Sequence, residues 1–130
     1  MFLHIETDNG LAVYDQIVRQ VKFAVADGTL SAGDMVSSVR ELAKELAINP
    51  NTVARAYRQL QDDGVLTQVR GTGLIVENGA RRSCVTERKR LIKARLRDVL
   101  VEAHQSGLNE PQIQELIQGE LQAARRQSEK

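Results

Sequence analysis

The sequence predicts a mainly α-helical protein that carries one small β-hairpin and ends in a pair of helices. Three observations lead to this fold class. Apolar residues recur at helical spacing in five segments, and two of these segments are joined by a short turn rich in capping residues. Two β-prone runs flank Gly71-Thr72-Gly73. Aromatic residues make up only 3% of the 130 residues, so the core must be aliphatic.

The chain begins with a candidate strand and a helix. We expect a short strand at Phe2–Ile5, followed by a turn at residues 8–10. A helix is predicted from about Val13 to Asp27, and Gly28 ends it as a C-terminal cap. Its inward face repeats at the helical period and comprises Tyr14, Ile17, Val21, Ala24 and Val25. Residues 30–34 are a connector in which Gly33 permits a turn.

Two further helices follow, joined by only three residues. The second helix begins near Ser38, and either Ser37 or Ser38 can cap it, since Glu41 lies three residues after Ser38 as in a capping box. Asn49 is a good N-cap and Pro50 a good first helical residue, so the third helix begins there and ends at Gly64. The predicted buried positions are Val39, Leu42, Ala43 and Leu46, then Val53, Ala56 or Tyr57, and Leu60. Two such helices match a helix-turn-helix.

A β-hairpin is predicted directly after the third helix, from Leu66–Arg70 and Leu74–Val76 around the glycine-supported tip. A helix-turn-helix followed by such a hairpin is a winged helix-turn-helix. The Gly-x-Gly at the tip is not a nucleotide-binding fingerprint, because a third glycine and a following helix are absent.

Polar residues on the third helix and at the hairpin tip favour DNA binding. Four polar residues lie beside or opposite the buried stripe and cluster toward the N-terminal half of the helix, the part that reaches base edges: Asn51, Thr52, Arg55 and Arg58. Arg70 at the tip can grip a phosphate or enter a minor groove. An exposed polar face is common to every surface helix, so the third helix alone does not separate DNA reading from simple solvation. The hairpin beside it shifts the balance.

The C-terminal third predicts a helical hairpin. Residues 79–84 look like a linker, a fourth helix runs from about Thr86 to Ser106, and Asn109 with Gln112 caps a fifth helix. Their apolar positions are Ile92, Leu96, Val99 and Leu100, then Ile113, Leu116, Ile117 and Leu121. A hairpin of this size is too small to be stable alone, so we expect the same hairpin of a second chain to cover it. Packing back onto the winged domain is the alternative.

These boundaries divide the chain into a winged helix-turn-helix domain (1–78), a linker (79–84) and a dimerisation hairpin (85–130). Charge follows the same division. Residues 1–80 hold seven Lys/Arg and ten Asp/Glu, a net charge of −3, whereas residues 81–130 have a net charge of +4. The run Arg81–Arg97 contains eight of these cations and one acid. It suits phosphate contacts or a solvated helix face, and the sequence leaves both open.

The residues give no support for an enzyme. No Gly-x-Ser-x-Gly, His-Glu-x-x-His or phosphate-binding loop is present. Metal ligation by His4, Cys84 and His104 would have to combine a strand, a linker and a helix, so no metal or cofactor is expected. No secretion signal or membrane-length apolar run of ~18 residues appears, and a single cysteine fits a reducing cytoplasm.

Several segments together resemble the GntR family of bacterial regulators. They are Gly33-Asp34, Ser38-Val39-Arg40-Glu41-Leu42-Ala43, Asn49 to Tyr57, Gly64-Val65-Leu66 and Arg70 to Gly73, with Val13 to Ile17 similar to the first-helix signature. The short tail is similar to the YtrA-like subfamily, in which it is a dimerising helix pair. The chain departs from the pattern at Ala12 and Ser37, where the family usually has proline, and this loosens two turns outside the reading face.

The resemblance implies DNA contacts at Arg40, Asn51, Thr52, Arg55, Arg70, Gly71, Thr72 and Gly73. It also implies a sequence-specific transcription regulator that acts as a homodimeric repressor on an inverted-repeat operator, near transporter genes in many subfamily members. The tail has little room for a ligand cavity, so relief by a small effector is left open. The alternative is a winged helix that binds protein or RNA, because fold alone does not determine function.

Overall fold

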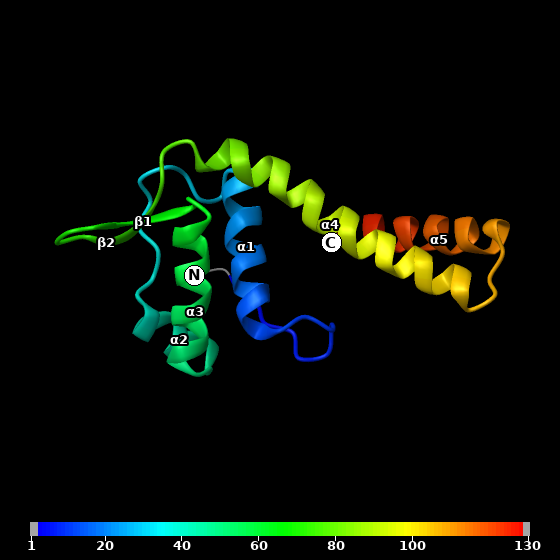
Figure 1. Cartoon of the computed structure of the whole chain (residues 1–130), viewed down its shortest axis with the longest axis horizontal. Helices are drawn as coiled ribbons and strands as arrows, with labels where there is room; N and C mark the ends of the chain where they lie inside the picture. The colour runs from blue at the N-terminus through cyan, green and yellow to red at the C-terminus, as the bar shows by residue number, and fades with distance from the viewer. Residues whose placement is uncertain (1–2, 129–130) are drawn as a thin grey trace. The chain divides into compact units, whose positions relative to one another are not determined.

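The computed structural model of the chain describes residues 3–128, which belong to two compact units, Met1–Arg90 and Leu91–Lys130. The first unit contains α1 (Val13–Asp27), α2 (Val39–Leu46), α3 (Pro50–Asp62), β1 (Leu66–Val69), β2 (Gly73–Val76) and the first turns of α4 (Ala80–Gln105). The rest of α4 and α5 (Glu110–Ser128) form the second unit. The predicted mainly helical fold with a small β wing is confirmed (Figure 1).

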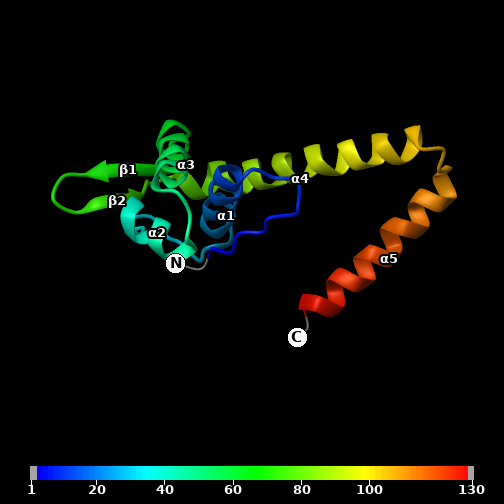
Figure 2. The same cartoon turned by 90° about the horizontal axis from the view of Figure 1, so that it is seen from below.

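The core of the first unit lies between three helices. Side by side in both views, α1 and α3 pack along one another, and α2 packs against α3 (Figures 1 and 2). All three helices contribute to the most deeply buried side chains, which are almost entirely aliphatic: Ile17, Val21, Val25, Leu42, Val53, Tyr57 and Leu60. Val65, Leu66, Val76 and Cys84, which follow α3 in the chain, are buried as deeply. The helical periodicity therefore identified most of the core, and both Ala56 and Tyr57 are buried. The predicted positions Tyr14, Val39 and Leu46 are only partly buried and pack against this core.

The wing is an antiparallel pair with the register Leu66↔Val76 to Val69↔Gly73. The connector before α2 forms a third pairing partner that the sequence did not reveal. Met35 bridges to Ile75, and the backbone of residues 33–36 exchanges hydrogen bonds with Val76 and Leu74 at 2.8–3.0 Å. The wing is thus attached to the segment that leads into α2.

The predicted strand at Phe2–Ile5 is wrong over its described residues, because residues 3–6 pair with side chains and not with another strand. Gln20 of α1 accepts from His4 N and donates to His4 O, at 2.8 and 2.5 Å. Gln16 does the same for Glu6, at 2.8 and 2.6 Å. The two side-chain amides satisfy the backbone N–H and C=O groups of this segment as a neighbouring strand would. This role explains why the polar residue Gln16 is buried on α1. Phe2 lies outside the described residues.

The predicted linker at residues 79–84 is also wrong, because α4 begins at Ala80. Gly79 takes a φ of 81° and turns the chain, and the residues after it enter the helix at once. Ala80 and Cys84, one turn apart, are 2% and 1% exposed in the core of the first unit. Burial raises the pKa of the Cys84 thiol, so it stays protonated. The first turns of α4 therefore belong to the winged unit.

The second unit has the predicted local signals but buries very little. Gly107, with a φ of 99°, follows α4, and Asn109 and Gln112 form a reciprocal capping box at the start of α5. Beyond this turn α5 diverges from α4 (Figure 2). No residue of α5 is buried within its described length, and large apolar side chains are exposed, among them Ile92, Leu96, Val99, Leu116, Ile117 and Leu121. Leu100 and Ile113, nearer the turn, are half-buried.

Candidate nucleic-acid interface

The start of α2 presents Arg40 to solvent. Ser38 and Glu41 form the predicted capping box, in which Ser38 Oγ accepts from Glu41 N and Glu41 Oε1 accepts from Ser38 N, both at 3.1 Å. These hydrogen bonds lower the pKa of Glu41 and keep its carboxylate charged. Arg40 is the second residue of the helix and forms no ion pair within residues 3–128. Its guanidinium is available to an external anion.

A tight turn sets α3 against α2. Ala47 adopts the left-handed conformation, with φ 56° and ψ 47°, and its N–H bonds back to the carbonyls of α2. Asn49 then caps α3 by accepting from Asn51 N at 2.8 Å, and Pro50 is the first helical residue. Farther along α3, Tyr57 donates its hydroxyl hydrogen to Ser37 O at 2.7 Å and so joins α3 to the segment before α2.

The outward face of α3 carries polar and basic side chains. Asn51, Arg55 and Arg58 are exposed and recur at intervals of three and four residues, opposite the buried stripe of Val53 to Leu60. Thr52 is half-buried at the edge of this face. The Asn51 amide forms no hydrogen bond through its side chain within residues 3–128, whereas the Asn49 side chain is occupied as the cap.

The Arg55 guanidinium has a partner that the sequence did not predict. Its central carbon lies 3.6 Å from the centre of the Tyr14 ring, which belongs to the first turn of α1. Tyr14 packs against the core as the helical period predicts, but it is only half-buried and its ring also contacts Arg55. The helical period places a residue on a face and does not reveal which side chain of another helix covers it.

The wing tip presents Arg70, Gly71 and Thr72 to solvent. Gly71 and Gly73 have φ angles of 82° and 119°, and Thr72 N donates to Val69 O at 3.0 Å to close the tip. A side chain at either glycine position would be strained, and an open backbone lets the tip approach another molecule closely. Arg70 forms no ion pair in the described part of the chain.

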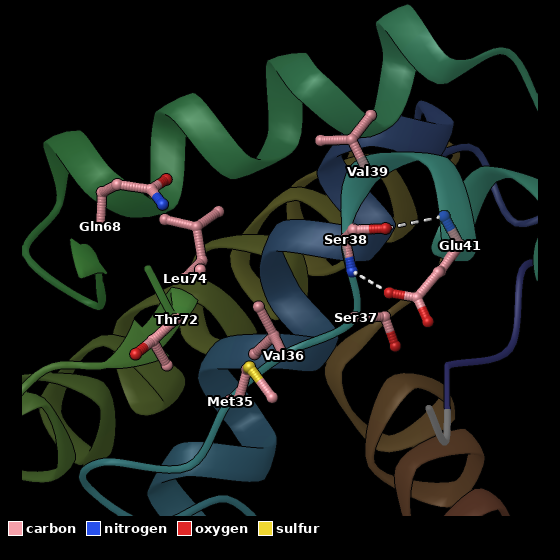
Figure 3. Close-up of a pocket in the computed structure, with 10 residues that line it drawn as sticks. Met35, Val36, Ser37, Ser38, Val39, Glu41, Gln68, Thr72 and Leu74 are labelled. Atoms are coloured by element: carbon pink, nitrogen blue, oxygen red, sulfur yellow. Dashed lines mark hydrogen bonds between the residues drawn. The ribbon is translucent and has the colours of Figure 1, made fainter. Parts of the chain in front are cut away.

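A groove of about 490 Å³ separates the wing from the start of α2 (Figure 3). Its walls include Met35, Ser38, Glu41, Gln68 and Leu74, and Met35 is 61% exposed beside it. No lining residue is cationic, and the charged Glu41 carboxylate faces it. The groove therefore does not attract an anion.

All eight predicted contact residues thus lie on α2, α3 and the wing of one compact unit. Arg40, Asn51, Arg55, Arg70, Gly71 and Thr72 are exposed, while Thr52 and Gly73 are half-buried. Within residues 3–128 no three His, Cys, Asp or Glu side chains gather as metal ligands, and none of the helices described could cross a membrane.

The basic run after the wing lies on α4. An ionic cluster connects the first turns of this helix to α1 and α3. Lys22 Nζ lies 2.8 Å from Asp63 Oδ2 and 3.8 Å from Glu87 Oε1, and the Lys22 side chain is 8% exposed. Gln59 also donates to Asp63, and Arg90 binds Glu87. Hydrogen bonding from Arg90, with the charge of Lys22 beyond it, lowers the pKa of Glu87. Part of the basic run is thereby used within the chain.

Comparison with known proteins agrees with this geometry. Residues 13–76 match the model of the bacterial regulatory proteins of the gntR family. The chain is 32% identical over 115 residues to the HTH-type transcriptional repressor YtrA of Bacillus subtilis, covering 88% of each.

Solved structures agree as well. A GntR family transcriptional regulator from Listeria monocytogenes is 31% identical, with a TM-score of 0.68 over 87% of this chain and 98% of that one. YtrA from Sulfolobus acidocaldarius, a GntR-family transcription factor, is 31% identical with a TM-score of 0.57, over 74% and 97% of the two chains. The winged unit, its exposed arginines and these similarities lead to one conclusion: the chain belongs to the GntR family of bacterial regulatory proteins and is a transcription regulator.

Proposed function

We propose that the chain is a cytoplasmic repressor that binds an inverted-repeat operator as a homodimer. One observation carries the DNA-binding part of this proposal. Arg40, Asn51 and Arg70 extend from α2, α3 and the wing of one unit, and none of their side chains forms an ion pair or side-chain hydrogen bond within residues 3–128. Arginine suits phosphate or guanine, and asparagine suits adenine. In this proposal Asn51 and Thr52 read bases, while Arg40 and the wing grip the backbone.

The exposed apolar residues of the second unit support the homodimer. Six large aliphatic side chains of α4 and α5 that the sequence suggested for dimerisation are between 37% and 59% exposed. Such a concentration of exposed aliphatic residues marks an interaction surface. A two-fold pair of these units would bring two α3 helices to successive major grooves, ~34 Å apart. Bound over a promoter, the dimer would block polymerase.

The proposal is tested by selection of DNA from a pool of random-sequence duplexes with the full-length protein. We expect enrichment of an inverted repeat whose half-sites lie about one helical turn apart. Fluorescence anisotropy with the selected duplex, a scrambled duplex and a single-stranded RNA of the same sequence then measures specificity. Binding to the selected duplex should be at least about 10³-fold tighter than to the scrambled one.

Four outcomes would overturn all or part of the proposal. Equal affinity for all duplexes would exclude an operator. Tighter binding to the RNA would favour the RNA-binding alternative, and no binding to either would favour a protein-binding winged helix. Selection of DNA sites without inverted symmetry would be consistent with specific DNA binding but would refute a two-fold dimer on an inverted repeat.

A further inference from the structure

The contact between Tyr14 and Arg55 gives the outward face of α3 a feature that no predicted role explains. The guanidinium carbon lies 3.6 Å from the ring centre, close enough for the planar group to rest on the ring. The two residues come from different helices, the first turn of α1 and the sixth position of α3. Tyr14 is half-buried, so its ring is held by the packing of α1, whereas Arg55 is exposed.

This contact uses the face of the guanidinium and leaves its edge free. Arginine has five N–H donors, all in the plane of the group, and stacking on a ring occupies none of them. Within residues 3–128 none of the Arg55 donors bonds to a protein acceptor, and no carboxylate pairs with the group. The ring therefore limits where the guanidinium can lie, while its hydrogen-bonding capacity remains available.

The position on α3 indicates which acceptor the edge would meet. Arg55 is the sixth of the thirteen residues of α3 and lies one turn after Asn51 on the same face, farther from the N-terminal end of the helix than Asn51 and Thr52. Its side chain is drawn toward α1 by the ring, so it does not extend along α3 toward the bases. An acceptor on the DNA backbone suits this place better than a base.

We propose that Tyr14 is a positioning residue for DNA binding: its ring holds the Arg55 guanidinium flat, so that the edge binds a phosphate oxygen of the operator. The inference rests on the proposed DNA-binding function and adds a role for α1. Because the ring fixes the guanidinium in the free protein, less side-chain freedom is lost when DNA binds. Tyr14 itself needs only its ring for this role, and its hydroxyl is dispensable.

Single substitutions provide the first test, with the selected operator duplex and full-length protein. Tyr14→Leu removes the ring and keeps an apolar contact, and should raise Kd about three- to fivefold. Tyr14→Phe retains the ring and should restore wild-type Kd. Arg55→Ala should raise Kd similarly on all duplexes and reduce the slope of log K against log salt by about one. Unfolding of each variant, followed by circular dichroism, shows that the fold is intact.

The decisive measurement is the coupling between the two residues. In an Arg55→Ala background, Tyr14→Leu should have almost no further effect on Kd. Arg58 provides the matched control, because it is exposed one turn along the same helix and forms no cation–π contact in the described chain. In an Arg58→Ala background, the full effect of Tyr14→Leu should persist.

The two hypotheses fail in different ways. If the wild-type protein selects no operator, the proposed function is wrong. If it does, and Tyr14→Leu weakens binding equally with and without Arg55, Tyr14 only supports helix packing and the positioning role is refuted. Loss of binding in Tyr14→Phe would instead assign the effect to the hydroxyl and overturn the inference too. A change confined to certain base pairs would mean that Arg55 reads bases and not phosphate.

Discussion

At the scale of single residues, some polar side chains of the winged unit have free hydrogen-bond donors, whereas others already form hydrogen bonds within the chain. Asn49 and Asn51 differ by two positions and by role, because the first accepts from the backbone of α3 and the second has an unbonded amide in the described structure. Arg70 at the wing tip is likewise unpaired within residues 3–128. A free amide can read a base edge, whereas a free cation on a backbone-rich tip suits a phosphate.

We therefore expect Arg70→Ala and Asn51→Ala to weaken DNA binding in different ways. Arg70→Ala should lower affinity for every duplex and reduce the salt slope by about one. Asn51→Ala should reduce discrimination at one base pair by about 1–3 kcal/mol and leave the salt slope unchanged. Anisotropy titrations on operator variants at several salt concentrations measure both effects. Arg126→Ala, an exposed arginine of α5, is the charge-matched control.

Identical profiles for the Arg70 and Asn51 variants across those duplexes would contradict the division between gripping and reading residues.

The turn between α2 and α3 depends on one strained residue. Ala47 is the only non-glycine residue with a positive φ among residues 3–128. This conformation costs an L-residue roughly 1–2 kcal/mol, and glycine adopts it without that strain. Ala47→Gly should therefore raise the free energy of unfolding by about 0.5–1 kcal/mol, measured by urea denaturation.

Ala54 in α3 is the matched control for Ala47, because the same substitution there removes a good helix former. Ala54→Gly should lower the free energy of unfolding by about 1 kcal/mol. If both glycine variants were destabilised equally, the left-handed conformation of Ala47 would not lower the stability of the wild-type protein.

At the scale of elements, the first turns of α4 are fastened to the helices that hold the reading face. Lys22 of α1 is nearly buried between Asp63, which caps α3, and Glu87 of α4. Two carboxylates converge on this one ammonium group, so removing it leaves them close together without their shared cation. Loss of one partner in such a cluster is more damaging than the pair's net contribution.

Lys22→Met should lower the free energy of unfolding by about 1–3 kcal/mol near neutral pH. The matched control is Lys44→Met on α2, an exposed lysine without an ion pair in the described chain, which should change it by less than about 0.5 kcal/mol. Urea denaturation at low and high salt measures both. An unchanged free energy of unfolding for Lys22→Met would show that water solvates the Asp63 and Glu87 carboxylates well enough without Lys22.

At the scale of the whole molecule, the two units differ in how well each buries its apolar residues. The first has a closed aliphatic core, whereas α5 buries no residue over its described length. A short helical pair of this kind gains little stability alone, because too little apolar area leaves water. We therefore expect the second unit to become stable only when its exposed leucines are covered by association with a second chain.

Leu116→Asp should convert a dimer into a monomer, because Leu116 is 56% exposed on the apolar face of α5 and a carboxylate there would be desolvated in an interface. Sedimentation velocity measures the change. Gln122→Asp introduces the same charge on the opposite face of α5 and should leave the dimer intact. A Leu116→Asp protein that still sediments as a dimer would move the proposed interface elsewhere.

The sequence by itself determined the features that depend on neighbours a few residues away. Helix periods, the capping boxes at Ser38 and Asn109, the Asn49 cap and the glycine turns were all predicted correctly. Each arises from interactions within about four residues, which the order of amino acids states directly. The DNA-contact candidates followed from these elements and from family resemblance.

Tertiary structure alone decided the pairings between distant segments. The extended residues 3–6 bond to Gln16 and Gln20, residues 33–36 pair with β2, and Ala80 with Cys84 enters the core. Arg55 rests on Tyr14, 41 positions earlier in the chain. A polar amide, a short connector or a half-buried aromatic ring has many acceptable partners, and only packing selects one. That is the physical reason why α1 became part of the candidate DNA surface only once the helices were placed together.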